Sequence, residues 1–179
     1  MTDEALMEAV RDGDLQQMSL LFERYHKRIF NFLARMTMDR DVAEDLTQNV
    51  FLRMIRYRAS FKGTKFQPWA YQVARNIFSD HYRAHKNVNT NFIDVEKVSD
   101  KVSDSNETIM QDEREELLHR SLAMLDEEQR EVLVLTRFQQ LKYDEVALIM
   151  NTTESNIKVK VHRAIAKLRE HYFALEKIS

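Results

Sequence analysis

Hydrophobic residues recur every three or four positions along most of the chain, and this spacing predicts amphipathic helices. The first helix runs from Leu15 to Thr37, with an apolar side made of Leu15, Met18, Leu21, Phe22, Tyr25, Ile29, Phe32, Leu33 and Met36. A second begins at Asp41, whose pairing with Glu44 resembles a capping box. Its apolar side consists of Val42, Leu46, Val50, Met54 and Tyr57.

A third helix starts between Thr64 and Pro68 and continues to about His85, because proline is tolerated in a first helical turn. The stretch that follows, residues 87–108, is polar and aperiodic. It predicts a flexible linker between two small helical domains, at residues 1–86 and 109–179.

Helical spacing returns from Ile109 to Leu125, and Asp126 with Gln129 marks the cap of a further helix. Two more segments, Tyr143 to Met150 and Glu154 to about Leu175, are joined by the short polar sequence Asn-Thr-Thr. The pattern as a whole predicts an all-α protein with two small helical domains.

The amino-acid composition supports the helical prediction and excludes several kinds of functional site. Two glycines and one proline in 179 residues leave little of the turn chemistry that hairpins and phosphate-binding loops require. The absence of cysteine excludes disulfides, thiolate zinc sites and a cysteine nucleophile, and it fits the reducing cytoplasm. The N-terminus is acidic and has no secretory apolar core, so we expect any membrane association to come through a partner.

Charge is segregated along the chain although the formal net charge is only −2. Residues 53–86 carry a net charge of +7, whereas residues 94–116 carry −6. Because the local field governs attraction to phosphate, the basic stretch is compatible with nucleic-acid binding and the linker is acidic.

The segment from Tyr143 to Arg169 has the layout of a helix-turn-helix. Asn151 suits the left-handed backbone of the reversal, and Thr153 suits the N-cap of the second helix. Ile157, Val161, Ile165 and Leu168 then face inward, so that the outer side exposes Ser155, Asn156, Lys158, Val159, Lys160, His162 and Arg163. The structural alternative is an ordinary helical hairpin with a solvated basic face.

The basic stretch of the first domain is interleaved with aromatic residues, an arrangement that suits unpaired DNA because bases stack on rings while cations neutralise the backbone. On the third helix, Gln72, Arg75, Asn76, Ser79 and Arg83 share one side, opposite Ala70, Val73, Ala74 and Ile77. The competing interpretation assigns the rings to the core, and we favour it for Phe66, Tyr71 and Phe78.

Three stretches, DVAEDLTQNVFLRMIR, FQPWAYQVARNIFSDHYRAHK and LDEEQREVLVLTRFQQLKYDEVALIMNTTESNIKVKVHRAIAKLRE, occur in this order. Together they resemble regions two and four of bacterial RNA polymerase sigma factors of the extracytoplasmic-function group. The resemblance implies promoter-directed transcription initiation with core RNA polymerase and promoter DNA, duplex and single-stranded, as partners. It also implies an anti-sigma factor as regulator, and either cytoplasmic localisation or retention at the inner membrane through that regulator.

The same resemblance assigns roles to individual positions. The outward side of the second helix would clamp the coiled coil of the largest polymerase subunit, through Asp45, Gln48, Asn49, Leu52, Arg53 and Arg56. Relatives often carry glutamate at the position of Asn49, so either Asp45 supplies the charge or the cognate polymerase surface differs. The segment from Leu122 to Leu135 would seat the flap tip of the second-largest subunit.

Both promoter elements receive candidate contacts. The turn from Phe61 to Phe66 and the following helix would capture a flipped base of the minus-ten element, with Lys65, Trp69, Gln72, Arg75, Asn76, Ser79 and Arg83 as candidates. The minus-thirty-five element would contact Ser155, Asn156, Lys158, Val159, His162 and Arg163. The acidic linker would either mimic nucleic acid in the RNA exit path or act as a plain solvated connector.

Three rival hypotheses remain at this stage. An enzyme is disfavoured because no phosphate loop or metal motif is present and His81 with His85 is only an i, i+4 pair; no cofactor and no small-molecule substrate are expected. A conventional repressor could use the same helix-turn-helix but would bind duplex DNA without polymerase. An inactive member held in a stress-sensing complex is compatible with the same residues.

Overall fold

The computed structural model describes residues 1–86 and 106–178, and in these residues every regular element is helical. Its α-helices are α1 (Asp3–Arg11), α2 (Met18–Thr37), α3 (Arg40–Arg56), α4 (Phe66–Lys86), α5 (Asn106–Ala123), α6 (Glu127–Leu133), α7 (Tyr143–Ile149) and α8 (Glu154–Glu176). Short 3₁₀ turns at Leu15–Gln17 and Arg58–Ser60 and a π-helical turn at Val134–Phe138 connect them. The predicted all-α fold is confirmed.

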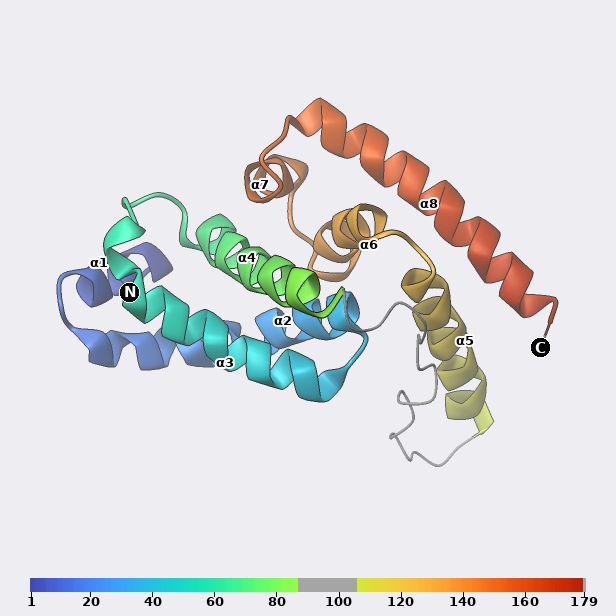
Figure 1. Ribbon diagram of the computed structural model, residues 1–179, viewed down its shortest axis with the longest axis horizontal. Coiled ribbons are helices and arrows are strands. Elements are labelled where there is room, and N and C mark those ends of the chain that lie inside the picture. Colours follow the sequence, from blue (N-terminus) through green and yellow to red (C-terminus); the bar gives the residue numbers. More distant parts are fainter. Residues whose placement is uncertain (87–105, 179) are drawn as a thin grey trace.

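The first domain is built around α2, α3 and α4, which pack against one another (Figure 1). Its core contains Phe32, Leu33, Met54, Phe66 and Tyr71, all of which are fully buried. Aromatic rings meet edge to face within it, for example Phe32 with Tyr71 at 5.7 Å between centroids. The core assignment of Phe66, Tyr71 and Phe78 is confirmed, since all three side chains are buried.

Helix α1 was not predicted from the sequence. Thr2 caps it by accepting a hydrogen bond from the backbone N–H of Ala5, and Leu6, Met7 and Val10 are buried against the rest of the domain. Their spacing, the cap residue Thr2 and the acidic first turn were the available signals, but the helix has only nine residues.

Helix α1 also orders the turn before α4. The Glu4 carboxylate accepts a hydrogen bond of 3.0 Å from the backbone N–H of Phe66, at the start of α4, while Arg11 donates to the carbonyl oxygen of Phe61 at 3.3 Å. Gly63 lies between them with φ of +73°, a conformation that glycine adopts without strain. Two side chains of α1 therefore hold the 61–66 turn in place, although they are far from it in the sequence.

The predicted cap of α3, Asp41, was wrong by two residues. Helix α3 begins at Arg40, and its N-cap is Asp39, which accepts hydrogen bonds from the backbone N–H groups of Asp41 and Val42. The predicted linker, residues 87–108, lies mostly outside the described residues, but its last three positions already belong to α5.

The second domain places α5 and α6 against α8, with α7 packed on α8 as the first helix of a hairpin (Figure 1). Asp126 caps α6 by accepting from the N–H of Gln129, as predicted. The fully buried residues of this core include Val132, Val134, Val146 and Ile157.

Arg130 links the end of α5 in the second domain to the end of α2 in the first domain by hydrogen bonds. Its guanidinium donates to four carbonyl oxygens: Leu122, Ala123 and Leu125 at the end of α5, and Met36 near the end of α2. Carbonyls at helix C-termini lack intrahelical partners and carry partial negative charge, so a cation suits this position.

Replacing Arg130 by alanine is therefore expected to lower the free energy of unfolding by about 2–4 kcal/mol, because several partly buried carbonyl groups lose their donor. Urea denaturation followed by circular dichroism measures the change. The control is Arg137→Ala, which removes an exposed side chain with one hydrogen bond of 3.4 Å and should change the stability by less than about 0.5 kcal/mol. Equal effects of the two substitutions would contradict the fastening role of Arg130.

Candidate functional site

The outward side of α3 is polar except for one leucine. Ala43, Leu46, Val50 and Met54 are buried against α2 and α4, and this leaves five of the predicted polymerase-contacting residues exposed: Asp45, Gln48, Asn49, Leu52 and Arg56. Leu52 is 63% exposed, and nothing in the first domain covers it.

Arg53 differs from the other members of this set. Its guanidinium is half-buried and lies 3.2 Å from the carboxylate of Asp80 on α4. Asp80 also binds Arg83 at 2.9 Å, so the single acid of the basic stretch bridges two arginines. The geometry makes Arg53 a contact between α3 and α4, and only part of its side chain remains available to a partner.

The candidate minus-ten residues, Lys65 and six residues of α4, fall into two groups. Lys65, Asn76 and Arg83 are exposed, and Ser79 is partly exposed. Trp69 is half-buried, with its ring 5.2 Å from Phe61 and 6.0 Å from Phe66, which are both fully buried. Of the aromatic residues at this turn, only Trp69 can offer part of its surface to a base.

Gln72 and Arg75, the other two members, contact the second domain. The amide of Gln72 donates to the carbonyl oxygen of Leu148 at 2.8 Å. Arg75 donates through Nε to the carboxylate of Glu131 at 2.8 Å, and its terminal nitrogen lies 3.5 Å from the carbonyl oxygen of Ile149. The sequence predicted that both residues lie on an exposed polar side of α4. In the structure, the second domain covers this part of α4.

Glu131 is a buried carboxylate with one cationic partner. Its side chain is only 4% exposed, and burial raises its pKa above the ordinary glutamate value, while the charge of Arg75 opposes the rise. Removing Arg75 would leave this charge unpaired, and a buried unpaired charge is strongly unfavourable. Glu131 was not predicted as a functional residue, because it ends a run of six polar residues, Asp126 to Glu131, that is typical of an exposed helix start.

The predicted helix-turn-helix is present as α7 and α8. Asn151 adopts the left-handed conformation with φ of +55°, and Thr153 caps α8 by accepting from the N–H of Asn156 at 3.2 Å. Val146, Ala147, Ile157 and Val161 form the buried contact between the two helices.

The first turns of α8 present their outer side to solvent. All six predicted minus-thirty-five residues are exposed: Ser155, Asn156, Lys158, Val159, His162 and Arg163. Lys160 is half-buried and forms an ion pair with Glu128 of α6, so it is occupied within the domain. An exposed basic helix start of this kind can enter a major groove, where lysine and arginine donate to guanine.

The predicted flap seat, Leu122 to Leu135, keeps little of its apolar surface exposed. Its apolar residues are core residues, since Leu122, Leu125, Val132, Leu133, Val134 and Leu135 are all at most 3% exposed. Their periodicity matches α6 and the π-helical turn packing inward. Met124, which is 48% exposed, is the one large apolar side chain of this segment at the surface.

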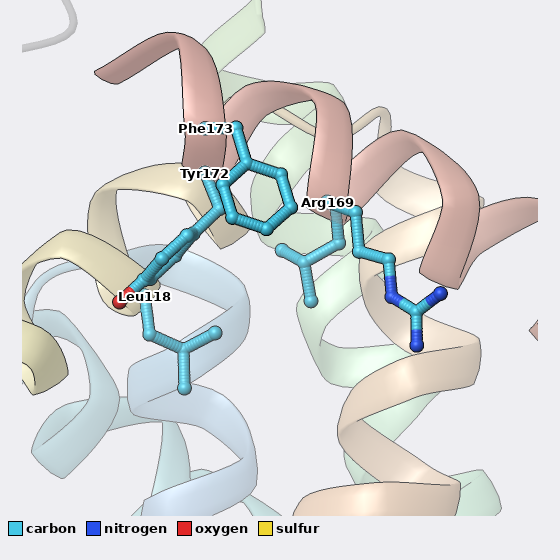
Figure 2. A pocket seen from close by; sticks show the side chains of 5 residues that line it. Leu118, Arg169, Tyr172 and Phe173 are labelled. Carbon is cyan, nitrogen blue, oxygen red and sulfur yellow. The ribbon is translucent and has the colours of Figure 1, made fainter. Parts of the chain in front are cut away.

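A small cavity opens between α5 and the C-terminal half of α8. Its volume is about 140 Å³, and Leu118, Leu168, Arg169, Tyr172 and Phe173 line it. Figure 2 shows Leu118 close to the rings of Tyr172 and Phe173, with the guanidinium of Arg169 pointing away from them. Phe173 is 56% exposed, so this edge of the second domain is apolar and partly open.

The histidine pair of α4 has a simple structural environment. The rings of His81 and His85 stack at 4.1 Å, and burial together with the neighbouring His85 lowers the pKa of His81. No group of three potential metal ligands occurs among the residues that the structure describes. A membrane-spanning helix is likewise not found within these residues.

Models of known protein families match both domains of the chain. The family model for sigma-70 region 2 matches residues 21–88, and that for sigma-70 region 4 matches residues 115–168. The first range contains the exposed side of α3 and the whole of α4, and the second contains the helix-turn-helix. The two matches define the class as a two-domain transcription initiation factor.

Proteins of similar sequence show which group within this class the chain belongs to. The chain is 34% identical over 158 residues to the ECF RNA polymerase sigma factor SigM of Bacillus subtilis, covering 85% of this chain and 93% of SigM. It is 32% identical to the RNA polymerase sigma factor CarQ of Myxococcus xanthus, over 95% of this chain and 97% of CarQ. The chain belongs to the extracytoplasmic-function group of RNA polymerase sigma factors, which initiate transcription at promoters and are not enzymes.

Solved structures resemble the chain over both domains. CnrH, determined in complex with the cytosolic domain of CnrY, matches with a TM-score of 0.71 at 20% identity, over 96% of this chain and 97% of CnrH. RpoE of Bartonella quintana, determined in complex with the anti-sigma factor NepR, matches with a TM-score of 0.66 at 26% identity, over 88% and 96% of the two chains. The expected two-domain sigma fold is confirmed.

Proposed function

We propose that this sigma factor binds core RNA polymerase through the exposed side of α3, with Leu52 as the apolar centre of the contact. Asp45, Gln48, Asn49 and Arg56 surround that leucine and would pair with polar groups of the coiled coil in the largest subunit. Arg53 contributes with the part of its side chain that Asp80 leaves free. An apolar centre within a polar rim is a common composition of protein interfaces.

Promoter DNA is proposed to contact both domains. Residues 1–86 would capture the minus-ten element through Lys65, Trp69, Gln72, Arg75, Asn76, Ser79 and Arg83. Residues 109–179 would bind the minus-thirty-five element through Ser155, Asn156, Lys158, Val159, His162 and Arg163. Each contact is small, so affinity depends on both being made while polymerase holds the domains at a fixed separation, across the predicted linker of residues 87–108.

Regulation by an anti-sigma factor is proposed from relatives. The likeness to RpoE of Bartonella quintana, which was solved with the anti-sigma factor NepR, supports a partner of this kind. A membrane-bound partner of this class would hold the sigma factor at the inner membrane. When the partner dissociates, the sigma factor would enter the cytoplasm. The flap of the second-largest polymerase subunit is the proposed partner of the second domain.

One observation carries the proposal most directly: the start of α8 exposes a basic outer side, while the buried packing of α7 holds that helix in place. Run-off transcription with core polymerase, followed by mapping of transcript start sites, tests it. Start sites with a shared sequence upstream at both elements are the expected result. Tight binding of duplex DNA by the chain alone, with no gain from core polymerase, would indicate a conventional repressor instead.

A further inference from the structure

The turn at residues 61–66 has buried ends and an exposed middle. Phe61 and Phe66 are fully buried, whereas residues 62–65 are exposed. Among the turns and loops of the described residues, the backbone of residues 62–65 forms no hydrogen bond with another backbone group. A loop without internal hydrogen bonds changes conformation easily unless its neighbours restrict it. The conformation of this turn therefore depends on the groups that contact it from outside.

Helix α1 supplies such groups along one of its sides. Glu4, Glu8 and Arg11 are spaced four and three residues apart, so they lie on the same side of the helix. The carboxylate of Glu4 accepts from the backbone N–H of Phe66 at 3.0 Å, and Arg11 donates to the carbonyl oxygen of Phe61 at 3.3 Å. Both ends of the turn are thus bonded to one side of one helix.

Glu8 lies between these two contacts and approaches the middle of the turn. A Cβ atom at Gly63 would stand 3.1 Å from Oε1 of Glu8, which is tighter than an ordinary van der Waals contact. The φ of +73° also favours glycine at this position. The backbone of the turn therefore comes close to α1 at its middle as well as at its two ends.

Helix α1 is itself anchored in the first domain independently of the turn. Asp3 accepts a hydrogen bond from the hydroxyl of Tyr25 and forms an ion pair of 2.6 Å with Arg24, both on α2. Three apolar side chains of α1 are buried in the core: Leu6, Met7 and Val10. Because the helix is fixed by these contacts, its side chains can hold the turn at a defined place.

The bond from Glu4 also stabilises the start of α4. The first backbone N–H groups of a helix have no partner within the helix and carry partial positive charge. Pro68 has no N–H, and Glu4 accepts from that of Phe66. A carboxylate suits this place, and it supports the first helical turn of α4, which carries Trp69.

The same turn carries part of the proposed minus-ten site. Lys65 is exposed within it, and the half-buried ring of Trp69 lies 5.2 Å from the ring of Phe61 and 6.0 Å from that of Phe66. The two rings that contact Trp69 are therefore the two ends of the turn. A shift of the turn would displace Lys65 and Trp69 relative to each other.

We propose that α1 is a positioning element for minus-ten recognition, with Glu4 and Arg11 as its positioning residues. They hold the 61–66 turn in the conformation that receives a base turned out of the DNA stack, and they act through the turn. The inference rests on the proposed role of the turn and of Trp69 in binding that base. A preorganised site loses less conformational entropy on binding, whereas a site that can rearrange accepts other sequences more readily.

The test uses holoenzyme assembled from the full-length chain and core polymerase. One probe is a fluorescent single-stranded oligonucleotide with the minus-ten element found by start-site mapping, and the other has the same bases in scrambled order. Fluorescence anisotropy gives Kd for each probe, and the ratio of the two values measures discrimination. A loss of folded protein changes both apparent affinities alike, so this ratio separates positioning from a merely structural role.

Glu4→Ala is expected to reduce the discrimination ratio by at least about five-fold, while competition binding to core polymerase stays unchanged. Glu4→Gln keeps an acceptor oxygen for the N–H of Phe66 and should restore the ratio to within about two-fold of the wild type. Arg11→Ala releases the other end of the turn and should reduce the ratio as well. The matched control is Asp14→Ala, which removes the same charge as Glu4→Ala from an exposed position outside α1 and should leave the ratio unchanged.

A wild-type ratio in both Glu4→Ala and Arg11→Ala would overturn the proposal, as would an equal loss in Asp14→Ala or no recovery in Glu4→Gln. Lys65→Ala and Trp69→Ala distinguish this failure from failure of the proposed function. If these two substitutions reduce the ratio and the α1 variants do not, only the positioning role of α1 is wrong. If neither of them reduces it, the minus-ten site lies elsewhere and the role of α1 falls with it.

Discussion

Replacing Leu52 by aspartate is expected to weaken binding to core RNA polymerase by at least about thirty-fold, which corresponds to roughly 2 kcal/mol. Leu52 is 63% exposed at the centre of a polar surface, and a complex would bury it against the polymerase. Aspartate at this position would bring an unpaired charge into that contact. Competition with a labelled sigma factor for core polymerase measures the affinity.

The matched control is Leu15→Asp, because Leu15 is 44% exposed and lies outside α3. It introduces the same charge and should leave polymerase binding within about two-fold of the wild type. Circular dichroism should show both variants folded, since neither side chain belongs to the buried core. Unchanged assembly of the Leu52 variant would mean that polymerase binds a different surface.

Alanine at Lys158 or Arg163 is expected to reduce transcription from promoters that depend on the upstream element by about ten-fold or more. A good contact of a basic side chain with a base contributes about 1–3 kcal/mol of discrimination. Both side chains are exposed on the outer side of α8 and have no partner that competes with DNA among the hydrogen bonds and ion pairs of the described residues. Run-off transcription at the mapped promoters measures the loss, and competition binding to core polymerase should be unchanged.

Lys167→Ala provides the control for this experiment. Lys167 lies farther along α8, is 50% exposed, and pairs with Glu170 at 3.3 Å in a surface ion pair. Such pairs contribute little to stability, so the control tests loss of positive charge without loss of the proposed contact. An equal loss of transcription in the control, or an equal loss of polymerase binding in Lys158→Ala, would contradict the assignment of this surface to the upstream element.

Local pattern predicted most of the helices because their causes are local. The apolar spacing of α2, the cap of α6 by Asp126 and the left-handed Asn151 all depend on residues within one or two turns of each other. The start of α3 was misplaced because two aspartates, Asp39 and Asp41, can each cap a helix. Which of them does so depends on where the chain reverses after α2.

Long-range side-chain roles could not be predicted in the same way. Glu4 binds the backbone N–H of Phe66 across 62 positions of sequence, and Arg130 donates to Met36 across 94. The residues of Leu122 to Leu135 carried an apolar pattern that fits a docking surface as well as a core. Only the packing of α6 against α8 shows that their apolar side faces inward.

The sequence by itself determined the helical class, the helix-turn-helix and the division of each helix into an apolar and a polar side, because periodicity and capping act over a few residues. Tertiary structure alone decided which part of the polar side stays open. Gln72 and Arg75 share a side of α4 with Asn76, yet acceptors 76 and 56 positions later in the chain cover the first two and leave Asn76 exposed. Hydrogen bonds over such separations leave no local signal, since they arise only when the two domains pack together.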